Sequence, residues 1–340
     1  MARDRLAGAL LGAALGDALG LPAEGLSAEA IRRRFGRLER FRLLGEAGFV
    51  SDDTELAALT AQSLARHPAD ARACARDFQR ALAGWVLRLP WGVGWATLKA
   101  GLRSAAGLRE TASASAGNGA LTRAPIVGVF FAADPDRRRD FVDVLSRTTH
   151  SDPRALAAAR FAADLAAACA TSRRGFPLEV AWDAARGVEE PAVRVALADA
   201  LALAASEADP TEAAARLGTT GFAVHTVGLG TFMFARYGDA PLRALTETVA
   251  AGGDTDSCAA LVGAWCGALH GEGALPAALL ARIHDGPFGP SHLRALAACL
   301  AARTGGAAAD TPSYSALGAL ARNLALMPVI LAHGLRRLLP

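Results

Sequence analysis

Apolar residues recur along this chain with the period of an α-helix, about 3.6 residues. The pattern is clearest in four segments that are rich in alanine, leucine and arginine, at residues 54–66, 153–171, 191–207 and 257–269. Alternating runs of valine, isoleucine, threonine and aromatic residues, which are typical of β-strands, are nearly absent. Clusters of glycine, proline, aspartate and serine separate the helical segments. The sequence therefore predicts an all-α fold of roughly ten or more helices.

Nothing in the sequence divides the chain into separate domains. There is no proline- and serine-rich linker, no change in composition, and no internal repeat with a period of about 20–50 residues. A chain of 340 residues is long enough to bury a large hydrophobic core, since the buried fraction of the surface rises with chain length. We therefore predict one compact domain covering residues 1–340.

The first apolar segment follows a short basic start and resembles a signal peptide in this respect. Asp17 interrupts the apolar run, however, and no clear cleavage site of small residues follows it. Glycine also recurs at every fourth position, at Gly8, Gly12, Gly16 and Gly20. On a helix these glycines form one smooth stripe against which another backbone can pack closely. We therefore predict that this segment is a core helix of a cytoplasmic protein. The first apolar run and the run at 324–332 are both too short to span a bilayer, so we predict no membrane partner.

The composition excludes two broad classes of protein. With 52% hydrophobic residues and a formal net charge of +3, the chain is too apolar and too weakly charged to be disordered. Its five cysteines are odd in number and form no C-x-x-C pair, which excludes a disulfide scaffold and is typical of reduced thiols in the cytoplasm. The arginine runs at 32–34 and 137–139 are short and flanked by acidic or apolar residues. They favour solvated helix faces over a nucleic-acid site.

Two acidic turns carry the strongest chemical signal. Ser51-Asp52-Asp53-Thr54 and Gly252-Gly253-Asp254-Thr255-Asp256-Ser257 each stand directly before an apolar helical segment. Either turn alone is explained by helix capping, because Ser, Thr and Asp accept hydrogen bonds from the free N–H groups of a helix start. Adjacent carboxylates that meet in a pocket, in contrast, repel each other unless a cation neutralises them.

Hard divalent cations such as Mg²⁺ and Ca²⁺ select oxygen ligands of this kind. If the two turns converge in the folded chain, four carboxylates and two hydroxyls form a site for two metal ions. The residues after Asp254 do not match the EF-hand calcium loop. No second Cys or His lies at ligand spacing from Cys258, which argues against zinc. A further carboxylate, Glu24, lies in a predicted turn, where it is also explained as an exposed loop residue.

Five motifs, taken in order, resemble the ADP-ribosylglycohydrolase family, which includes the dinitrogenase-reductase-activating glycohydrolases. The resemblance covers roughly residues 5–300, and the G-G-D-T-D-S element is its most specific part. The motifs are Gly16-Asp17-Ala18-Leu19-Gly20 with Glu24, Ser51-Asp52-Asp53-Thr54, Asn118-Gly119-Ala120-Leu121-Thr122-Arg123, Gly252-Gly253-Asp254-Thr255-Asp256-Ser257 and Gly267-Ala268-Leu269-His270-Gly271.

This resemblance implies an all-α fold with a binuclear Mg²⁺ or Mn²⁺ centre at the bottom of a cleft. It implies six metal ligands, namely Ser51, Asp52, Asp53, Asp254, Asp256 and Ser257. Glu24 matches a glutamate that part of the family uses in catalysis, on a loop that we expect to be anchored at one end and free to move at the other. Asn118 and Gly119 match a loop that lines the ADP-ribose cleft. His150 matches a histidine near the ligand, although a helix start explains it equally well.

The implied reaction is hydrolysis of the glycosidic bond at C1″ of an ADP-ribosyl group, with release of ADP-ribose from a modified protein side chain. One departure matters, because relatives that cleave ADP-ribosyl-arginine often have Asp-x-Gly-x-x-Thr in the cleft, and this chain has Gly92 in place of the aspartate. We expect the nearby Trp91 and Trp95 to be core aromatics, with a role in shaping a different pocket as the alternative. Two other functions stay open: the same chemistry on a nucleotide or small-molecule conjugate, and a non-catalytic relative that binds ADP-ribose.

Overall fold

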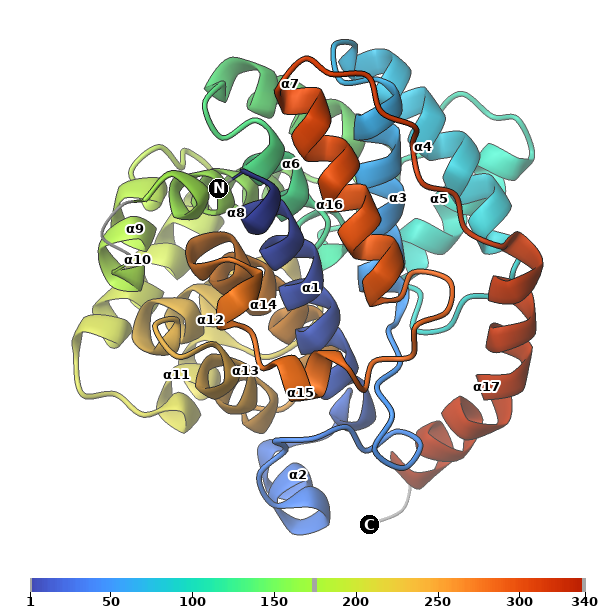
Figure 1. The fold of residues 1–340 in the computed structure, drawn as a ribbon. Coiled ribbons are helices and arrows are strands. Elements are labelled where there is room, and N and C mark those ends of the chain that lie inside the picture. Colours follow the sequence, from blue (N-terminus) through green and yellow to red (C-terminus); the bar gives the residue numbers. More distant parts are fainter. Residues whose placement is uncertain (1, 173–175, 338–340) are drawn as a thin grey trace.

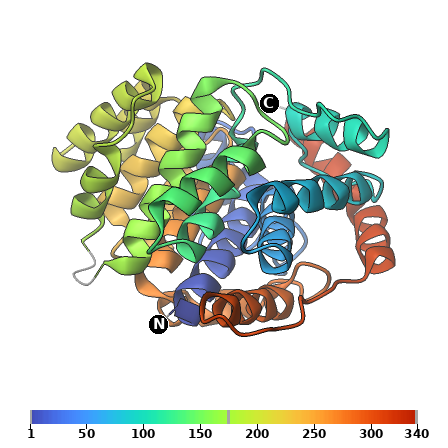
Figure 2. The same ribbon diagram turned by 90° about the horizontal axis from the view of Figure 1, so that it is seen from above.

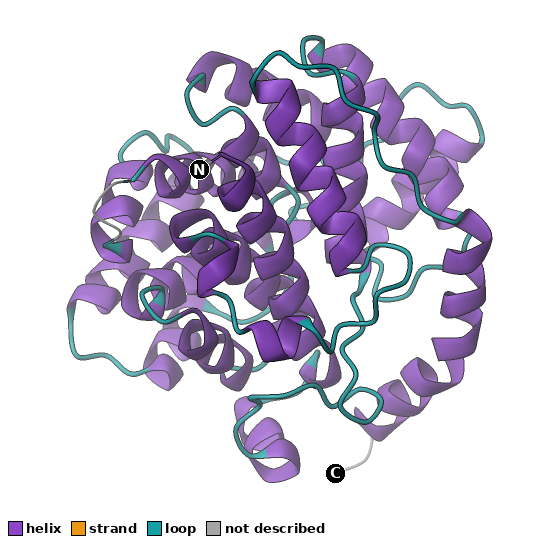
Figure 3. Cartoon of the chain, in the orientation of Figure 1, coloured by secondary structure: helices purple, strands orange, loops and turns teal. Residues whose placement is uncertain are grey.

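The computed structural model describes residues 2–172 and 176–337, and within these ranges all regular structure is helical (Figures 1 and 3). The prediction of an all-α fold is therefore confirmed. The α-helices are α1 (Ala2–Gly20), α2 (Ala28–Phe35), α3 (Asp52–Arg66), α4 (Ala71–Val86), α5 (Trp95–Ala105), α6 (Ala124–Phe130), α7 (Pro135–Ser146), α8 (Pro153–Thr171), α9 (Pro177–Ala185), α10 (Pro191–Ala205), α11 (Pro210–Leu217), α12 (Ala223–Tyr237), α13 (Pro241–Ala250), α14 (Thr255–His270), α15 (Ala277–Leu280), α16 (Pro290–Thr304) and α17 (Ala316–Arg337). Three short 3₁₀-helices are η1 (Leu21–Ala23), η2 (Asn118–Ala120) and η3 (Glu272–Ala274).

Helices α1 and α14 pack against each other with their backbones in contact near the centre of the molecule (Figure 1). A Cβ atom on Gly12 would lie 2.0 Å from the Gly263 carbonyl oxygen, and one on Gly263 would lie 2.0 Å from the Gly12 carbonyl oxygen. Gly8 and Gly267 oppose each other in the same way. The glycine stripe predicted from the sequence is therefore a packing groove, and α1 is buried from Leu6 to Gly20.

The other helices surround this pair (Figure 2). Helix α16 lies beside α1, α6 packs on α8, α10 packs on α12, and α4 packs on α5. One hydrophobic core joins them and includes Leu11 of α1, Phe78 of α4, Phe161 of α8 and Trp265 of α14. The described residues therefore form a single domain.

Helix α17 lies at the edge of the molecule and is anchored there by a buried polar network (Figure 1). The Arg322 guanidinium forms a buried ion pair with the Glu55 carboxylate of α3. The Asn323 amide donates a 2.9 Å hydrogen bond to the Arg88 carbonyl oxygen and accepts one of 3.2 Å from the Trp91 indole. Because a buried charge left without its partner is unfavourable, these contacts fix α17 against α3 and against the segment between α4 and α5.

Two described segments, Ala2–Ala23 and Ala316–Leu335, are long and apolar enough by composition to cross a membrane. Residues 6–23 of the first are buried inside the protein, which confirms the prediction of a core helix. Only 22% of the second is buried, and its exposed face carries Leu317, Leu324 and Leu331. The core accounts for the apolar character of the first segment but not for that of the second.

We expect Gly12→Ala to destabilise the protein by about 3 kcal/mol or more, because the added methyl meets a backbone carbonyl that cannot rotate away. Gly84→Ala in α4 is the matched control. Its Cβ would meet only the end of the flexible Arg88 side chain, at 3.2 Å, and alanine favours a helix over glycine by about 1 kcal/mol. The measurement is urea unfolding of both variants. Equal stability of the two would contradict the backbone contact between α1 and α14.

Candidate functional site

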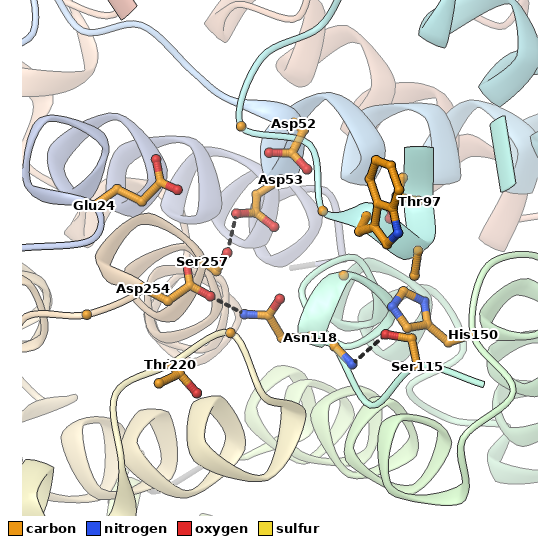
Figure 4. Close-up of a pocket in the computed structure, with 18 of the residues that line it drawn as sticks. Glu24, Asp52, Asp53, Thr97, Ser115, Asn118, His150, Thr220, Asp254 and Ser257 are labelled. Atoms are coloured by element: carbon orange, nitrogen blue, oxygen red, sulfur yellow. Dashed lines mark hydrogen bonds between the residues drawn. The ribbon is translucent and has the colours of Figure 1, made fainter. Parts of the chain in front are cut away.

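The two acidic turns come together at the starts of α3 and α14 (Figure 4). The Ser257 hydroxyl of the second turn donates a 2.8 Å hydrogen bond to the Asp53 carboxylate of the first, across a sequence separation of 204 residues. Asp52 and Asp53 lie in the first turn of α3, and Asp254 and Asp256 lie at the start of α14. The convergence on which the sequence interpretation depends is therefore present. Both helix N-termini also bring the positive ends of their dipoles to the same region.

A buried aspartate of α1 holds the first turn in place. The Asp17 carboxylate accepts hydrogen bonds from the backbone N–H groups of Ser51 and Thr54, at 2.9 and 3.2 Å, and from the Thr54 hydroxyl, at 2.5 Å. Burial raises the pKa of Asp17 to about 6, and the hydrogen bonds from Thr54 and Ser51 oppose that rise. The sequence alone predicts no role for Asp17, although an acid that interrupts an apolar run is a signal that can reveal one.

The loop that carries Glu24 is bound to the second acidic turn. The Gly25 N–H donates to the Gly253 carbonyl oxygen at 2.7 Å, and the Gly253 N–H donates to the Leu26 carbonyl oxygen at 2.8 Å. The expectation that this loop is anchored at only one end is therefore wrong, because backbone hydrogen bonds hold its far side as well. Glu24 is half-buried and lines the cleft described below.

The clustered carboxylates raise one another's pKa values. Burial raises the pKa of Asp53 to about 7, and the negative charges of Asp17 and Asp254 add to the rise. The pKa values of Asp52 and Asp256 are raised well above the usual range, first by burial and then by neighbouring carboxylates. Each carboxylate therefore makes ionisation of the others less favourable, and a cation would relieve this.

The chemistry of these side chains fits a hard divalent cation. Among the described residues that line the cleft there is no lysine or arginine to offset the carboxylates. Carboxylate and hydroxyl oxygens are the ligands that Mg²⁺ and Mn²⁺ prefer. Across residues 2–172 and 176–337, no three Asp, Glu, His or Cys side chains stand in the arrangement of a formed metal cluster. The assignment of six ligands therefore stays a prediction. It requires these side chains to lie closer together when the ions are bound.

Helix capping explains part of the first turn but not the second. The Ser51 hydroxyl accepts a 3.3 Å hydrogen bond from the Asp53 N–H, as an N-cap residue does. Asp254 stands at the corresponding position of α14, yet its side chain makes no capping hydrogen bond. Its carboxylate instead accepts a 2.6 Å hydrogen bond from the Asn118 amide. Ser51 and Asp256 are both buried and lie outside the cleft lining, whereas Asp254 faces the cleft.

A cleft with a volume of about 560 Å³ opens over the acidic turns, a size that suits a small-molecule ligand (Figure 4). Its polar lining consists of Glu24, Asp52, Asp53, Thr97, Ser115, Asn118, His150, Thr220, Asp254 and Ser257, and Gly119 also borders it. Asn118 and Gly119 therefore both line the cleft, and their contact with ADP-ribose stays a prediction. The Asn118 amide is directed toward the acidic cluster, however, and also donates to the Thr226 hydroxyl at 3.0 Å.

His150 borders the cleft as a neutral ring. Its Nδ1 lies 2.8 Å from the Thr149 hydroxyl oxygen, and burial together with the Arg123 charge lowers its pKa to about 3. Arg123 is itself buried, and its guanidinium donates to the Gly119 carbonyl oxygen and, at 2.7 Å, to the Thr149 hydroxyl. Arg123 therefore ties the loop that begins at Asn118 to His150. In the sequence Arg123 belongs to the motif that begins at Asn118, but no role is predicted for it there.

The two tryptophans beside the acidic cluster have different environments. Trp91 is buried, as expected for a core aromatic. Trp95 is 68% exposed and lines the cleft, so the expectation that it belongs to the core is wrong. Trp95 is the first residue of α5, whose buried face is formed by Ala96, Thr97 and other small residues of that helix. The indole consequently projects beyond the packed face of the helix.

Known proteins are similar to this chain in sequence and in fold. A family model described as ADP-ribosylglycohydrolase matches residues 1–310. An uncharacterized protein of Archaeoglobus fulgidus is 28% identical over 294 residues, covering 84% of this chain and 93% of that protein. The uncharacterized protein YegU of Escherichia coli K12 is 28% identical over 317 residues, covering 83% of this chain and 92% of YegU.

A solved structure described as an ADP-ribosylglycohydrolase-related protein complex is similar in fold, with a TM-score of 0.68 and 29% sequence identity. The match covers 88% of this chain and 97% of that chain. The family model extends over the glycine stripe, both acidic turns and all the cleft-lining residues named above. This chain therefore belongs to the ADP-ribosylglycohydrolase family.

Proposed function

We propose that this chain is a metal-dependent hydrolase that cleaves the glycosidic bond of an ADP-ribosyl conjugate. One observation carries the proposal: carboxylates from two distant segments meet, with Asp52, Asp53 and Asp254 lining a cleft and Asp256 buried beside it, and the described lining contains no lysine or arginine. Two Mg²⁺ or Mn²⁺ ions are the proposed cofactors, held by Ser51, Asp52, Asp53, Asp254, Asp256 and Ser257. When bound, such ions supply positive charge that polarises nearby oxygen atoms and activates water.

Glu24 is the proposed general base or water-positioning group. Figure 4 shows its carboxylate in the same region as Asp53 and Asp254, on a segment of its own. In hydrolysis at C1″ the carbon gains oxocarbenium character, while water approaches from one side and the leaving group departs. The water oxygen forms the new bond to C1″ as the bond from C1″ to the leaving group breaks, and the water proton passes to Glu24, which returns a proton to the departing atom.

The opposite side of the cleft is the proposed ADP-ribose contact surface. Figure 4 places His150 and Ser115 there, away from Glu24. A neutral His150 can exchange hydrogen bonds with ribose or phosphate groups without adding a charge. Arg123 stabilises this surface, because its buried guanidinium donates hydrogen bonds to the Gly119 carbonyl oxygen and to the Thr149 hydroxyl beside His150.

A modified protein side chain in the cytoplasm is the first substrate that we propose, and a nucleotide or small-molecule conjugate is the second. A non-catalytic relative would be free to lose ligands, whereas this chain keeps every carboxylate of the two acidic turns. The deciding experiment measures release of ADP-ribose from arginine-, serine- and nucleotide-linked conjugates, with and without Mg²⁺. Metal-dependent release from any of them supports the proposal, and release from none of them contradicts it.

We expect Asp256→Ala to abolish hydrolysis and to weaken binding of Mg²⁺ or Mn²⁺ in calorimetry. Without metal, the variant should melt no lower than the parent protein, because loss of this buried carboxylate relieves repulsion from Glu24 and Asp254. The control is Asp209→Ala, which removes a helix cap from two N–H groups of α11. That loss should cost about 1 kcal/mol of stability and leave activity unchanged. Near-normal turnover of Asp256→Ala in Mg²⁺ would contradict the role of Asp256 as a metal ligand and leave it only a place at the start of a helix.

We expect Glu24→Gln to lower kcat by about 100-fold or more, the usual effect of losing a general base, while the affinity for ADP-ribose changes far less. The substitution keeps the size and hydrogen bonding of the side chain and removes only its basicity. Steady-state kinetics and calorimetric titration with ADP-ribose measure the two quantities. Glu29→Gln is the control, since Glu29 is an exposed residue of α2. Lost affinity with a normal kcat would instead identify Glu24 as a binding residue.

A further inference from the structure

Two glycines, Gly92 and Gly94, line the cleft next to Asp52. Gly92 lies beside the Asp52 carboxylate, so close that a Cβ atom at position 92 would lie 2.9 Å from the Asp52 Oδ1. Its φ of +80° also places it in the left-handed region, which side chains rarely adopt. Gly94 follows two residues later, and a Cβ there would meet no atom within 4 Å. Gly92 and Gly94 therefore place no side chain of their own in the cleft between Asp52 and the start of α5.

Trp95 follows Gly94 in the cleft lining, and Lys99 lies outside the lining but contacts the Trp95 ring. Trp95 lines the cleft and is 68% exposed, which leaves a large aromatic surface accessible. Lys99, the only lysine in the sequence, lies one helical turn further along α5. Its ammonium nitrogen is 5.2 Å from the centroid of the Trp95 indole, a cation–π contact. The indole is thus supported on one side by a cation, while part of it is open to the cleft.

The segment 92–99 contains no acidic residue, and this restricts what can lie against it. A guanidinium leaving group would stack on an indole, but here it would meet the Lys99 charge over the same ring, and the adjacent Asp52 carboxylate is a proposed metal ligand. A serine side chain has no planar group to stack. A neutral aromatic ring meets neither difficulty, and stacking of one nucleobase on an aromatic side chain raises affinity by roughly 5- to 150-fold.

We propose that Gly92, Gly94, Trp95 and Lys99 form a leaving-group subsite for a nucleobase, so that the preferred substrate is an ADP-ribosyl group linked to a ring nitrogen of a nucleoside or nucleotide. This inference rests on the proposed function and selects the second of its two substrate classes. The base stacks on the Trp95 indole beside the acidic cluster, and Lys99 faces any phosphate that the nucleotide carries. In the reaction the bond from C1″ to the ring nitrogen breaks, water oxygen bonds to C1″, and a proton goes to the departing nitrogen.

The test compares three conjugates as substrates of the wild-type protein: ADP-ribose linked to a ring nitrogen of a purine nucleoside, to arginine, and to a serine peptide. We expect kcat/KM to be about 10-fold or more higher for the nucleoside conjugate than for the arginine conjugate. Trp95→Ala should lower kcat/KM for the nucleoside conjugate by about 10-fold or more and leave the serine conjugate within about two-fold. Trp95→Phe should retain most of the activity on the nucleoside conjugate, because the ring can still stack.

Two further variants make the test specific. Trp182→Ala, in α9, removes another exposed tryptophan that lies outside the cleft lining and should leave all three rates unchanged. Lys99→Gln should raise the rate with the arginine conjugate relative to the other two, because the repelling charge is gone. Thermal melts of each variant identify any loss of fold.

The outcomes separate this inference from the proposed function. Cleavage of the arginine or serine conjugate without cleavage of the nucleoside conjugate overturns the nucleobase subsite and leaves the hydrolase proposal standing. A loss of rate in Trp95→Ala that is equal for all three conjugates also overturns the subsite, because it marks Trp95 as a structural residue. Release of ADP-ribose from none of the three overturns the proposed function itself, and the subsite with it.

Discussion

The site depends on the backbone contact between α1 and α14. Gly20, at the end of α1, lies against the backbone of Thr255 and Asp256, so the second acidic turn is fixed relative to α1. Asp17, one turn earlier on the same helix, accepts hydrogen bonds from the first acidic turn at Ser51. One buried helix therefore supports both turns, and the glycines that allow its close packing also set the distance between them. A side chain in place of any of these glycines would separate the carboxylates as well as the helices.

The carboxylate cluster is locally unfavourable, and the surrounding packing has to support it. Burial and mutual repulsion raise the pKa values of Asp52, Asp53 and Asp256. Glu55, one turn further along α3, also contributes to the raised pKa of Asp52, and Arg322 of α17 forms a buried ion pair with Glu55. Such local strain is typical of sites that bind a ligand of opposite charge, because the rest of the fold supplies the stability that the site lacks.

Helix α17 also supports the segment between α4 and α5, which leads into the cleft wall at Gly92. Asn323 accepts a hydrogen bond from the Trp91 indole and donates one to the Arg88 carbonyl, on the segment that leads to Gly92 and Trp95. The family model ends at residue 310, before α17 begins. The acidic turns thus belong to the part of the chain that the family model matches, while a C-terminal helix outside that part holds the segment that leads to the proposed leaving-group subsite.

The sequence by itself determined the helical fold, the close packing of the first helix and the two acidic turns, because helical period, glycine spacing and capping residues act between near neighbours in the chain. Only the tertiary structure decided that Trp95 is exposed, that both sides of the Glu24 loop are held, and that Asp17 and Arg123 position the site. These features depend on contacts between distant segments, which determine burial and hydrogen-bond partners. A local pattern cannot specify such contacts, since the same residue types suit a core, a cap or a cleft.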